Sequence, residues 1–324
     1  MKEIIIREND SGQRLDKFLQ KAFPDLPQSL AFKYIRIKRI KVNGKRAANN
    51  QKLEVGDKIQ LYVNDEFISA ETEETPLFLK APSIINSVYE DENIILLNKK
   101  PGLLCHEDAS EKRDTLINRL LHFLYEKNEF DYKNELSFTP ALCNRIDRNT
   151  QGIVIAAKNA AALRDICDMI KNRTIEKKYL CIVHGTLPKS HDILKGYHTK
   201  DDNTNTVRIT SERRDGAKTA ITEYSVVAEK NNLSLLKVSL HTGRTHQIRA
   251  HLAAIGHPLL GDTKYGTLKQ NQPYNRKFQA LCSYYVKFGN FDKNSRLYYL
   301  SQKEFAINPA DIDFIKDYFN VTAI

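Results

Sequence analysis

The segment from Asp65 to Thr75 constrains the fold of this chain more than any other feature. It carries acidic and small residues with little apolar periodicity, and Pro76 and Pro82 follow it. Such a segment separates folding units rather than joining one helix or sheet. At 324 residues the chain also exceeds the usual domain size of roughly 100–200 residues. We therefore predict one domain over residues 1–75 and a larger one over residues 76–324.

The first unit has the pattern of two helices followed by a small sheet. Apolar residues at positions 15, 18, 19, 22 and 23 fit one helical face, and Ser29 is placed to cap a second helix that ends near Ile37. Residues 40–42 alternate as in a strand, and Asn43-Gly44 is typical of a hairpin turn.

Basic residues are concentrated in this unit. Between positions 33 and 46 there are seven basic residues and no acidic one. The chain as a whole has 50 Lys and Arg against 40 Asp and Glu, with a net charge of +10. This density favours a surface that contacts nucleic-acid phosphates, whereas a solvated helix end is the alternative. The residues that we expect to contact nucleic acid here are Lys33, Arg36, Lys38, Arg39 and Lys41.

The second unit is predicted to be α+β. Helical patterns separate only some of its strand-like runs, which argues against strict βαβ alternation. Strands are predicted at 94–97, 152–156, 179–183, 219–228 and 233–240, and helices at 115–127, 160–171 and 245–255. Residues 199–215 are polar, and we predict a protruding loop there.

Several classes of site lack their usual patterns. The sequence has no P-loop, no G-x-G-x-x-G, no H-E-x-x-H and no C-x-x-C motif. The histidines at 241, 246 and 251 are five residues apart, and on a helix that spacing rotates each by about 140°. They do not share a face, so a metal site there is disfavoured, as is one built with His257. We expect no metal and no cofactor.

The five cysteines are scattered, which favours reduced thiols over disulfides or a zinc site. No apolar signal-peptide segment follows the N-terminus, and no stretch approaches the roughly eighteen apolar residues of a membrane span. We therefore expect a cytoplasmic protein that makes no contact with membranes. We also expect it to be a monomer that requires no protein partner.

Asp147 is the candidate for a catalytic group. It stands in R-I-D-R-N-T-Q-G, directly before an apolar run at 153–157, so it is predicted to lie in the loop before a buried strand. Such loops often carry catalytic groups. Taken alone, an aspartate between two arginines is more often part of an ordinary ion pair.

The larger unit resembles the RluA-type pseudouridine synthases. The resemblance is carried by K-P-G-L-L-C-H at 100–106, N-R-I-D-R-N-T-Q-G at 144–152, K-K-Y-L at 177–180 and H-T-G-R-T-H-Q-I-R-A-H at 241–251, followed by G-H-P-L-L-G-D-T-K-Y-G at 256–266. The N-terminal R-L-D-K-F-L, V-N-G-K and V-G-D-K-I segments resemble an S4 RNA-binding domain. The resemblance implies an S4-like α/β domain and a catalytic domain with a mixed, largely antiparallel sheet flanked by helices.

The resemblance also implies roles for individual residues. Asp147 would be the nucleophile that attacks a flipped-out uridine, Tyr179 would stack on the base and Arg249 would pair with the aspartate. A carboxylate must be ionised to attack, and a neighbouring guanidinium favours that form. The motif leaves open whether the aspartate attacks C1′ of the sugar or C6 of the base, or abstracts a sugar proton. The alternative for Tyr179 is a strand residue packed in the core. The alternative for Arg249 is a surface arginine.

Four further residues are expected to contact RNA. Ile248 would pack on the base, Arg145 would fill the vacated base stack, and Arg244 would bind a phosphate at a helix start. Asn144 stands where the family usually has histidine. Asn149 and Gln151 also depart from the family pattern.

The resemblance implies that the protein isomerises uridine in RNA. In this family the RNA is most often that of the large ribosomal subunit. The departures at 144, 149 and 151 leave a second hypothesis, a non-catalytic RNA-binding protein with a relict site. A synthase directed to transfer RNA is a third, and a metal-dependent hydrolase that uses the C-terminal histidines is a fourth.

Overall fold

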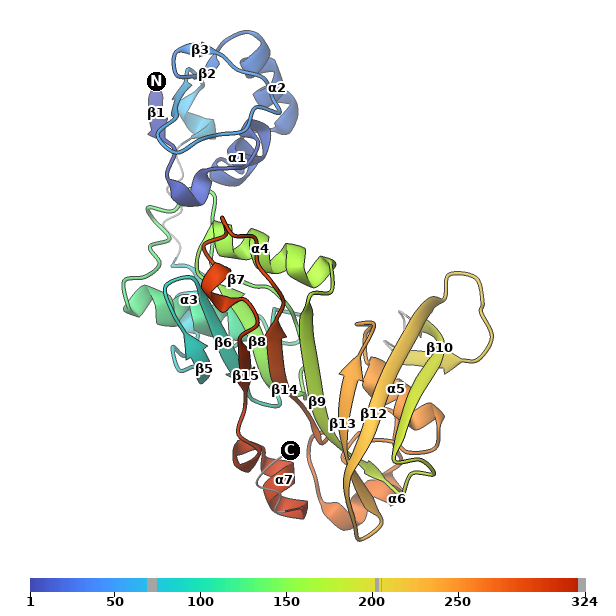
Figure 1. The fold of residues 1–324 in the computed structure, drawn as a ribbon. Helices are drawn as coiled ribbons and strands as arrows, with labels where there is room; N and C mark the ends of the chain where they lie inside the picture. The colour runs from blue at the N-terminus through green and yellow to red at the C-terminus, as the bar shows by residue number, and fades with distance from the viewer. Residues whose placement is uncertain (69–74, 202–203, 205, 320–324) are drawn as a thin grey trace.

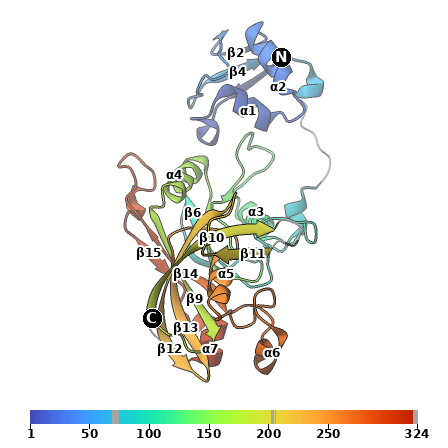
Figure 2. The same cartoon turned by 90° about the vertical axis from the view of Figure 1, so that its right-hand side faces the viewer.

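A computed structural model describes residues 1–68, 75–201, 204 and 206–319 of the chain (Figure 1). It contains two sheets. A four-stranded sheet in the order β1-β4-β2-β3 belongs to the N-terminal unit, and an eleven-stranded sheet belongs to the rest. Figure 2 shows the N-terminal unit as a separate body beyond the end of the large sheet. None of the described helices has the length and apolar character that crossing a bilayer requires.

The N-terminal unit confirms the predicted order of helix, helix and small sheet. Its elements are β1 (Lys2–Ile5), η1 (Glu8–Asp10), α1 (Leu15–Ala22), α2 (Gln28–Arg36), β2 (Ile40–Val42), β3 (Lys45–Arg46), β4 (Lys58–Leu61) and η2 (Asp65–Phe67). The apolar faces of both helices and the sheet form one buried core. Asn43 and Gly44 both have positive φ, 53° and 71°, as a two-residue hairpin turn requires.

One detail of this unit was predicted wrongly. Ser29 does not cap α2, because the helix begins at Gln28 and Pro27 occupies the cap position without a side-chain hydrogen bond. Proline is tolerated at a helix start, where a missing N–H removes no intrahelical bond. The helix therefore starts earlier in the chain than the serine suggests.

The larger unit mixes helices with long strands. Its first elements are η3 (Leu77–Lys80), β5 (Ser87–Glu90), β6 (Ile94–Lys99), α3 (Leu116–Glu126), β7 (Ala141–Leu142), β8 (Gln151–Ala157), α4 (Ala160–Lys171), β9 (Ile175–His184), β10 (His191–Asp201) and β11 (Thr206–Thr210). The remaining ones are β12 (Lys218–Lys230), β13 (Leu233–Leu240), α5 (Gln247–Ala254), α6 (Leu268–Asn271), η4 (Gln272–Tyr274), β14 (Leu281–Phe288), η5 (Tyr298–Leu300), β15 (Glu304–Ala306), η6 (Pro309–Asp311) and α7 (Asp313–Tyr318). All predicted strands and helices of this unit are present.

The large sheet is mixed and largely antiparallel, as predicted. Its order is β11-β10-β12-β13-β9-β14-β8-β6-β5, with β15 beside β14 and β7 beside β8. Only the β14–β8 pairing is parallel among the described strands. This single parallel junction joins the half of the sheet that follows residue 175 to the half that precedes it.

Helices cover both faces of the central strands. In β8, Ile153 and Ile155 pack in the cluster that includes α4, whereas Val154 and Ala156 pack in the cluster that includes α3. Alternate residues of a strand point to opposite faces, so β8 is buried on both sides. Its continuous apolar sequence follows from that position.

The polar segment 199–215 is not simply a loop. β10 extends through Asp201, and β11 pairs with it in register from Tyr197↔Thr210 to Asp201↔Thr206. The β-branched residues of T-V-R-I-T suit a strand, and the surrounding polar residues hid that signal in the sequence. Residues 202, 203 and 205 lie outside the described residues.

The two units touch through polar contacts. Asn9 Nδ2 donates to Glu135 Oε1 at 3.0 Å, and Ser137 Oγ donates to Asp10 Oδ1 at 2.6 Å. Asp10 is buried there, although it belongs to a short surface helix. The boundary predicted after residue 75 adjoins residues 69–74, which lie outside the described residues.

Candidate functional site

Asp147 lies in the loop between β7 and β8. Next to it, Ile146 is buried in the core beneath α3, and its carbonyl oxygen accepts a hydrogen bond from Cys105 Sγ at 3.5 Å. On the other side, Thr150 N donates to Asp147 O at 3.0 Å. These contacts hold the backbone on both sides of Asp147, whose side chain stays 28% exposed.

A buried lysine braces the same loop. The Nζ of Lys99 donates to the carbonyl oxygens of Lys100, Leu103 and Arg148 at 3.0, 2.8 and 2.8 Å. Gly102 N also donates to Arg148 O, at 2.9 Å. Burial lowers the pKa of Lys99 to about 8. The turn at residues 101–102 therefore supports the loop of Asp147. Sequence reasoning missed this role, although a lysine two residues after the apolar run that ends at Leu97 was its signal.

Gly152 permits the close approach beneath this loop. Its φ is +128°, and a Cβ atom there would lie 2.4 Å from the backbone oxygen of Ser283. Gly152 is paired with Ser283 in the parallel β8–β14 junction. Only glycine fits both the backbone angle and the contact. The position of Asp147 relative to the C-terminal strands depends on this residue.

Arg249 pairs with Asp147 from α5. Its Nη1 lies 3.0 Å from Asp147 Oδ2, across 102 positions in the sequence. The arginine side chain is only 9% exposed, so it is not a surface residue. Among the described residues, the side chain of Asp147 accepts hydrogen bonds only through Oδ2. Its other oxygen, Oδ1, is left open.

Asp262 holds the other side of the guanidinium. Its two oxygens accept bonds from Arg249 Nε at 2.7 Å and Nη2 at 3.0 Å, a bidentate pair. Its Oδ1 also accepts from the backbone N–H groups of Lys264 and Tyr265. Burial raises the pKa of Asp262, but the bonds from Arg249 outweigh it and lower the pKa overall. Sequence reasoning quoted G-D-T-K-Y-G without giving this aspartate a role.

The same balance keeps Arg249 charged. Burial lowers its pKa, but the bonds with Asp262 and the charges of Asp262 and Asp147 raise it overall. The guanidinium is thus a fixed cation between two carboxylates. Its bond to Oδ2 orients the side chain of Asp147.

Tyr179 and Ile248 belong to one buried apolar cluster. Tyr179 is on β9 and 7% exposed, and Ile248 is on α5 and 4% exposed. The ring of Tyr179 therefore packs in the core, which was the alternative to a role in stacking on the base. A stacking role on a bound base stays a prediction for both residues.

His246 also faces Asp147. Its Nε2 lies 3.8 Å from Asp147 Oδ2, and its Nδ1 lies 2.9 Å from Tyr265 Oη. The side chain is 10% exposed. Sequence reasoning considered this histidine only as a metal ligand. The other three histidines contact different partners: His241 contacts Glu223, His251 contacts Thr222 and His257 contacts the carbonyl of His184.

Three expected RNA contacts differ in their surroundings. Arg145 is exposed and stands two residues before Asp147. Asn144 Oδ1 accepts a bond from Ile155 N at 2.8 Å, so its amide supports β8. α5 begins at Gln247 rather than at Thr245, and the N–H of Arg244 is already bound by Gln247 Oε1. RNA contact by these residues stays a prediction.

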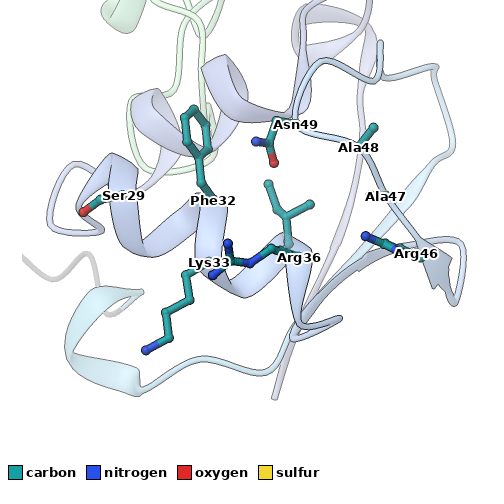
Figure 3. Close-up of a pocket in the computed structure, with 9 residues that line it drawn as sticks. Ser29, Phe32, Lys33, Arg36, Arg46, Ala47, Ala48 and Asn49 are labelled. Carbon is teal, nitrogen blue, oxygen red and sulfur yellow. The ribbon is translucent and has the colours of Figure 1, made fainter.

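A basic pocket lies on the N-terminal unit (Figure 3). It has a volume of about 630 Å³, and Lys33, Arg36 and Arg46 line it together with Phe32 and Asn49. Figure 3 shows Phe32, Lys33 and Arg36 on one helix and Arg46 across from them. Cationic side chains around an open hollow, with an aromatic ring among them, suit a nucleic-acid backbone.

The other predicted basic residues lie outside this pocket. The guanidinium of Arg39 lies over the ring of Tyr34 at 5.6 Å, and Lys41 Nζ lies over the ring of Tyr62 at 5.3 Å. Lys38 has a positive φ of 63° after α2 and is exposed. Lys38 and Arg39 thus lie between α2 and β2, and Lys41 lies on β2.

Family models match both units. Residues 93–254 match the model described as RNA pseudouridylate synthase, and residues 13–59 match the S4 domain. Among solved structures, human RNA pseudouridylate synthase domain containing 1 superimposes with a TM-score of 0.57 at 19% identity. That match covers 78% of this chain and 93% of the human one, and it shows the fold alone.

Curated relatives extend over most of the chain. An uncharacterized RNA pseudouridine synthase of Aquifex aeolicus is 35% identical, covering 81% of this chain and 79% of its own. Ribosomal large subunit pseudouridine synthase D of Buchnera aphidicola is 31% identical, covering 86% of each chain. The chain therefore belongs to the RluA-type RNA pseudouridine synthases and carries an S4 domain at its N-terminus.

Proposed function

We propose that this enzyme isomerises specific uridines of large-subunit ribosomal RNA, with Asp147 as the nucleophile on a flipped-out uridine. The observation that carries the proposal is the fixed Asp262–Arg249–Asp147 arrangement, which engages one oxygen of Asp147 and leaves the other open. The relatives named for the large ribosomal subunit support the choice of RNA.

The reaction needs a nucleophile and a confined base. The N1–C1′ bond breaks, C5 bonds to C1′ and releases its hydrogen, and N1 gains one, so no net redox change occurs. Tyr179 and Ile248 share one buried apolar cluster, which would form the wall for the uracil ring. Base extrusion costs a few kcal/mol, which stacking and phosphate contacts must offset. Arg145, exposed two residues before Asp147, is our candidate for the vacated stack.

We also propose that residues 1–75 act as an RNA-binding domain and residues 76–324 as the catalytic domain. Their separate apolar cores support this division. The pocket of Lys33, Arg36 and Arg46 would hold phosphates of the RNA, while Lys38, Arg39, Lys41 and Arg244 would add positive charge along its path.

Mapping of pseudouridine in total RNA tests the target. Cells without the gene should lose pseudouridine at discrete positions of large-subunit ribosomal RNA, and wild-type protein should restore them. Asp147→Asn should not. Loss at transfer RNA positions alone would replace the ribosomal target, and an unchanged map would favour a non-catalytic RNA-binding protein.

A further inference from the structure

His246 occupies an unusual backbone position at the start of α5. Its φ and ψ are 51° and 20°, in the left-handed region that non-glycine residues rarely adopt. Such a conformation is strained and persists only when its surroundings hold it. Here Ala250 N donates to His246 O at 2.9 Å, which ties the residue to the helix. The strained position points the imidazole at Asp147.

Tyr265 sets the protonation pattern of the ring. Its Oη accepts the N–H of Val207 at 3.0 Å and lies 2.9 Å from His246 Nδ1. Burial raises the pKa of Tyr265, so the phenol keeps its proton. Because that oxygen already accepts one bond, we assign the phenol proton to the bond with Nδ1. The neutral imidazole therefore carries its own proton on Nε2, the nitrogen nearest Asp147.

Burial of the ring favours its neutral form. Burial lowers the pKa of His246; the charges of Asp147 and Asp262 oppose this, and those of Arg249 and Lys264 reinforce it. The nitrogen that faces Asp147 is consequently a neutral donor. A second cation beside Oδ2 would stabilise the carboxylate further and make it a weaker nucleophile.

We propose that His246 is a positioning residue for Asp147, which presents the Nε2–H of a neutral imidazole to the oxygen that Arg249 also binds. Arg249 and His246 then face the same Oδ2, and Oδ1 is left for the uridine. The 3.8 Å separation is longer than a hydrogen bond, and contacts of this kind commonly shorten when substrate closes the site. This proposal rests on the proposed role of Asp147.

Three variants separate positioning from simple packing. His246→Gln keeps an N–H donor toward Asp147 and an oxygen that can accept from Tyr265. His246→Ala removes both groups, and Tyr265→Phe removes the hydroxyl that stabilises the neutral ring. His241→Gln is the matched control, because His241 is exposed and bonded to Glu223.

The measurement is the single-turnover rate of tritium release from ribosomal RNA labelled at uridine C5, from about pH 5 to about pH 8. His246→Ala should lose roughly ten- to a hundredfold in rate with nearly unchanged RNA affinity, and His246→Gln should recover much of it. Wild-type enzyme should lose rate at acid pH as the ring becomes charged. Tyr265→Phe should move that loss to higher pH, and His246→Gln should abolish it.

Two results would overturn the proposal. The first is that both His246 variants release tritium as fast as His241→Gln at every pH. The second is that His246→Gln still loses rate at acid pH. Melting temperatures identify an alanine variant that fails to fold, in which case the glutamine and phenylalanine variants decide. If Asp147→Asn stays active, the proposed function fails as well. If it is inactive while the His246 variants behave as wild type, only this inference fails.

Discussion

The site depends on charges that are buried in a fixed order. Asp262 has no exposed surface and Arg249 has little, so each needs the other to offset the loss of water. Asp147 lies at the partly exposed end of this row. A buried carboxylate thus keeps the cation in place, and the cation orients the carboxylate that meets the substrate.

Asp262→Asn should test this order. It would leave the guanidinium buried with Asp147 as its only carboxylate among the described residues, and breaking such a pair costs about 3–5 kcal/mol. We expect that loss in the free energy of unfolding, measured with urea, together with a lower rate. Glu304→Gln, which breaks the solvent-accessible pair with Lys287, is the control and should cost much less. Equal effects of the two variants would contradict the account.

At the scale of elements, the junction of β8 and β14 positions the site. The two strands pair in parallel, which brings the loop of Asp147 together with strands more than a hundred residues away. Periodicity predicted both the strands and the helices that flank them. It could not predict this pairing, because register between distant strands leaves no local pattern.

The same limit applies to the residues of the site. The resemblance implies roles for Asp147 and Arg249, whereas His246 and Asp262 lie in the quoted motifs without an implied role. Lys99, His246 and Asp262 take their roles from contacts with residues distant in sequence, such as Lys99 Nζ with Arg148 O. The local sequence suggests only that Lys99 is packed, that His246 has no special role and that Asp262 lies in a turn. Only the folded chain shows what each one holds.

Gly152→Ala should disrupt the junction. The new Cβ would meet the backbone of Ser283 rather than a movable side chain, at a φ of +128° that disfavours alanine. We expect a clear fall in melting temperature and loss of activity. Gly243→Ala is the matched control, because no atom lies within 4 Å of its added Cβ and its φ is not in the left-handed region. A junction variant as stable as this control would show that the close approach is not required.

At the scale of the whole molecule, the two units are joined through a polar contact that includes buried Asp10 and half-buried Glu135. Burial raises the pKa of Glu135, Asn9 opposes the shift by donating a bond, and the charge of Asp10 adds to it. A raised pKa means that the neutral form suits the folded state. Glu135 therefore stabilises the contact at low pH, and this contribution disappears as pH rises through its raised pKa.

Glu135→Gln should consequently stabilise the protein at neutral pH. It keeps an oxygen that can accept from Asn9 and removes the charge beside Asp10. The melting temperature should exceed that of wild type at about pH 7, and the difference should disappear toward about pH 4. Glu54→Gln, at an exposed position, is the control. If Glu135→Gln melts at or below the wild-type temperature at neutral pH, the charge of Glu135 does not destabilise this contact.

The basic pocket should control how binding depends on salt. Replacing Lys33, Arg36 and Arg46 together by glutamine should weaken RNA binding, because fewer phosphates are then neutralised by the protein. The slope of log affinity against log salt should become shallower by about 0.7 for each such phosphate. Fluorescence anisotropy with labelled ribosomal RNA at several salt concentrations measures both quantities. An unchanged slope would mean that the pocket does not bind phosphates.

Release of tritium from RNA labelled at uridine C5 tests the central claim most directly, because forming the C5–C1′ bond expels that hydrogen. Wild-type protein should release tritium from large-subunit ribosomal RNA up to a fixed amount per molecule. Asp147→Asn should bind the same RNA with nearly the same affinity, keep its melting temperature and release none. Release by Asp147→Asn at close to the wild-type rate would contradict the assignment of Asp147 as the nucleophile.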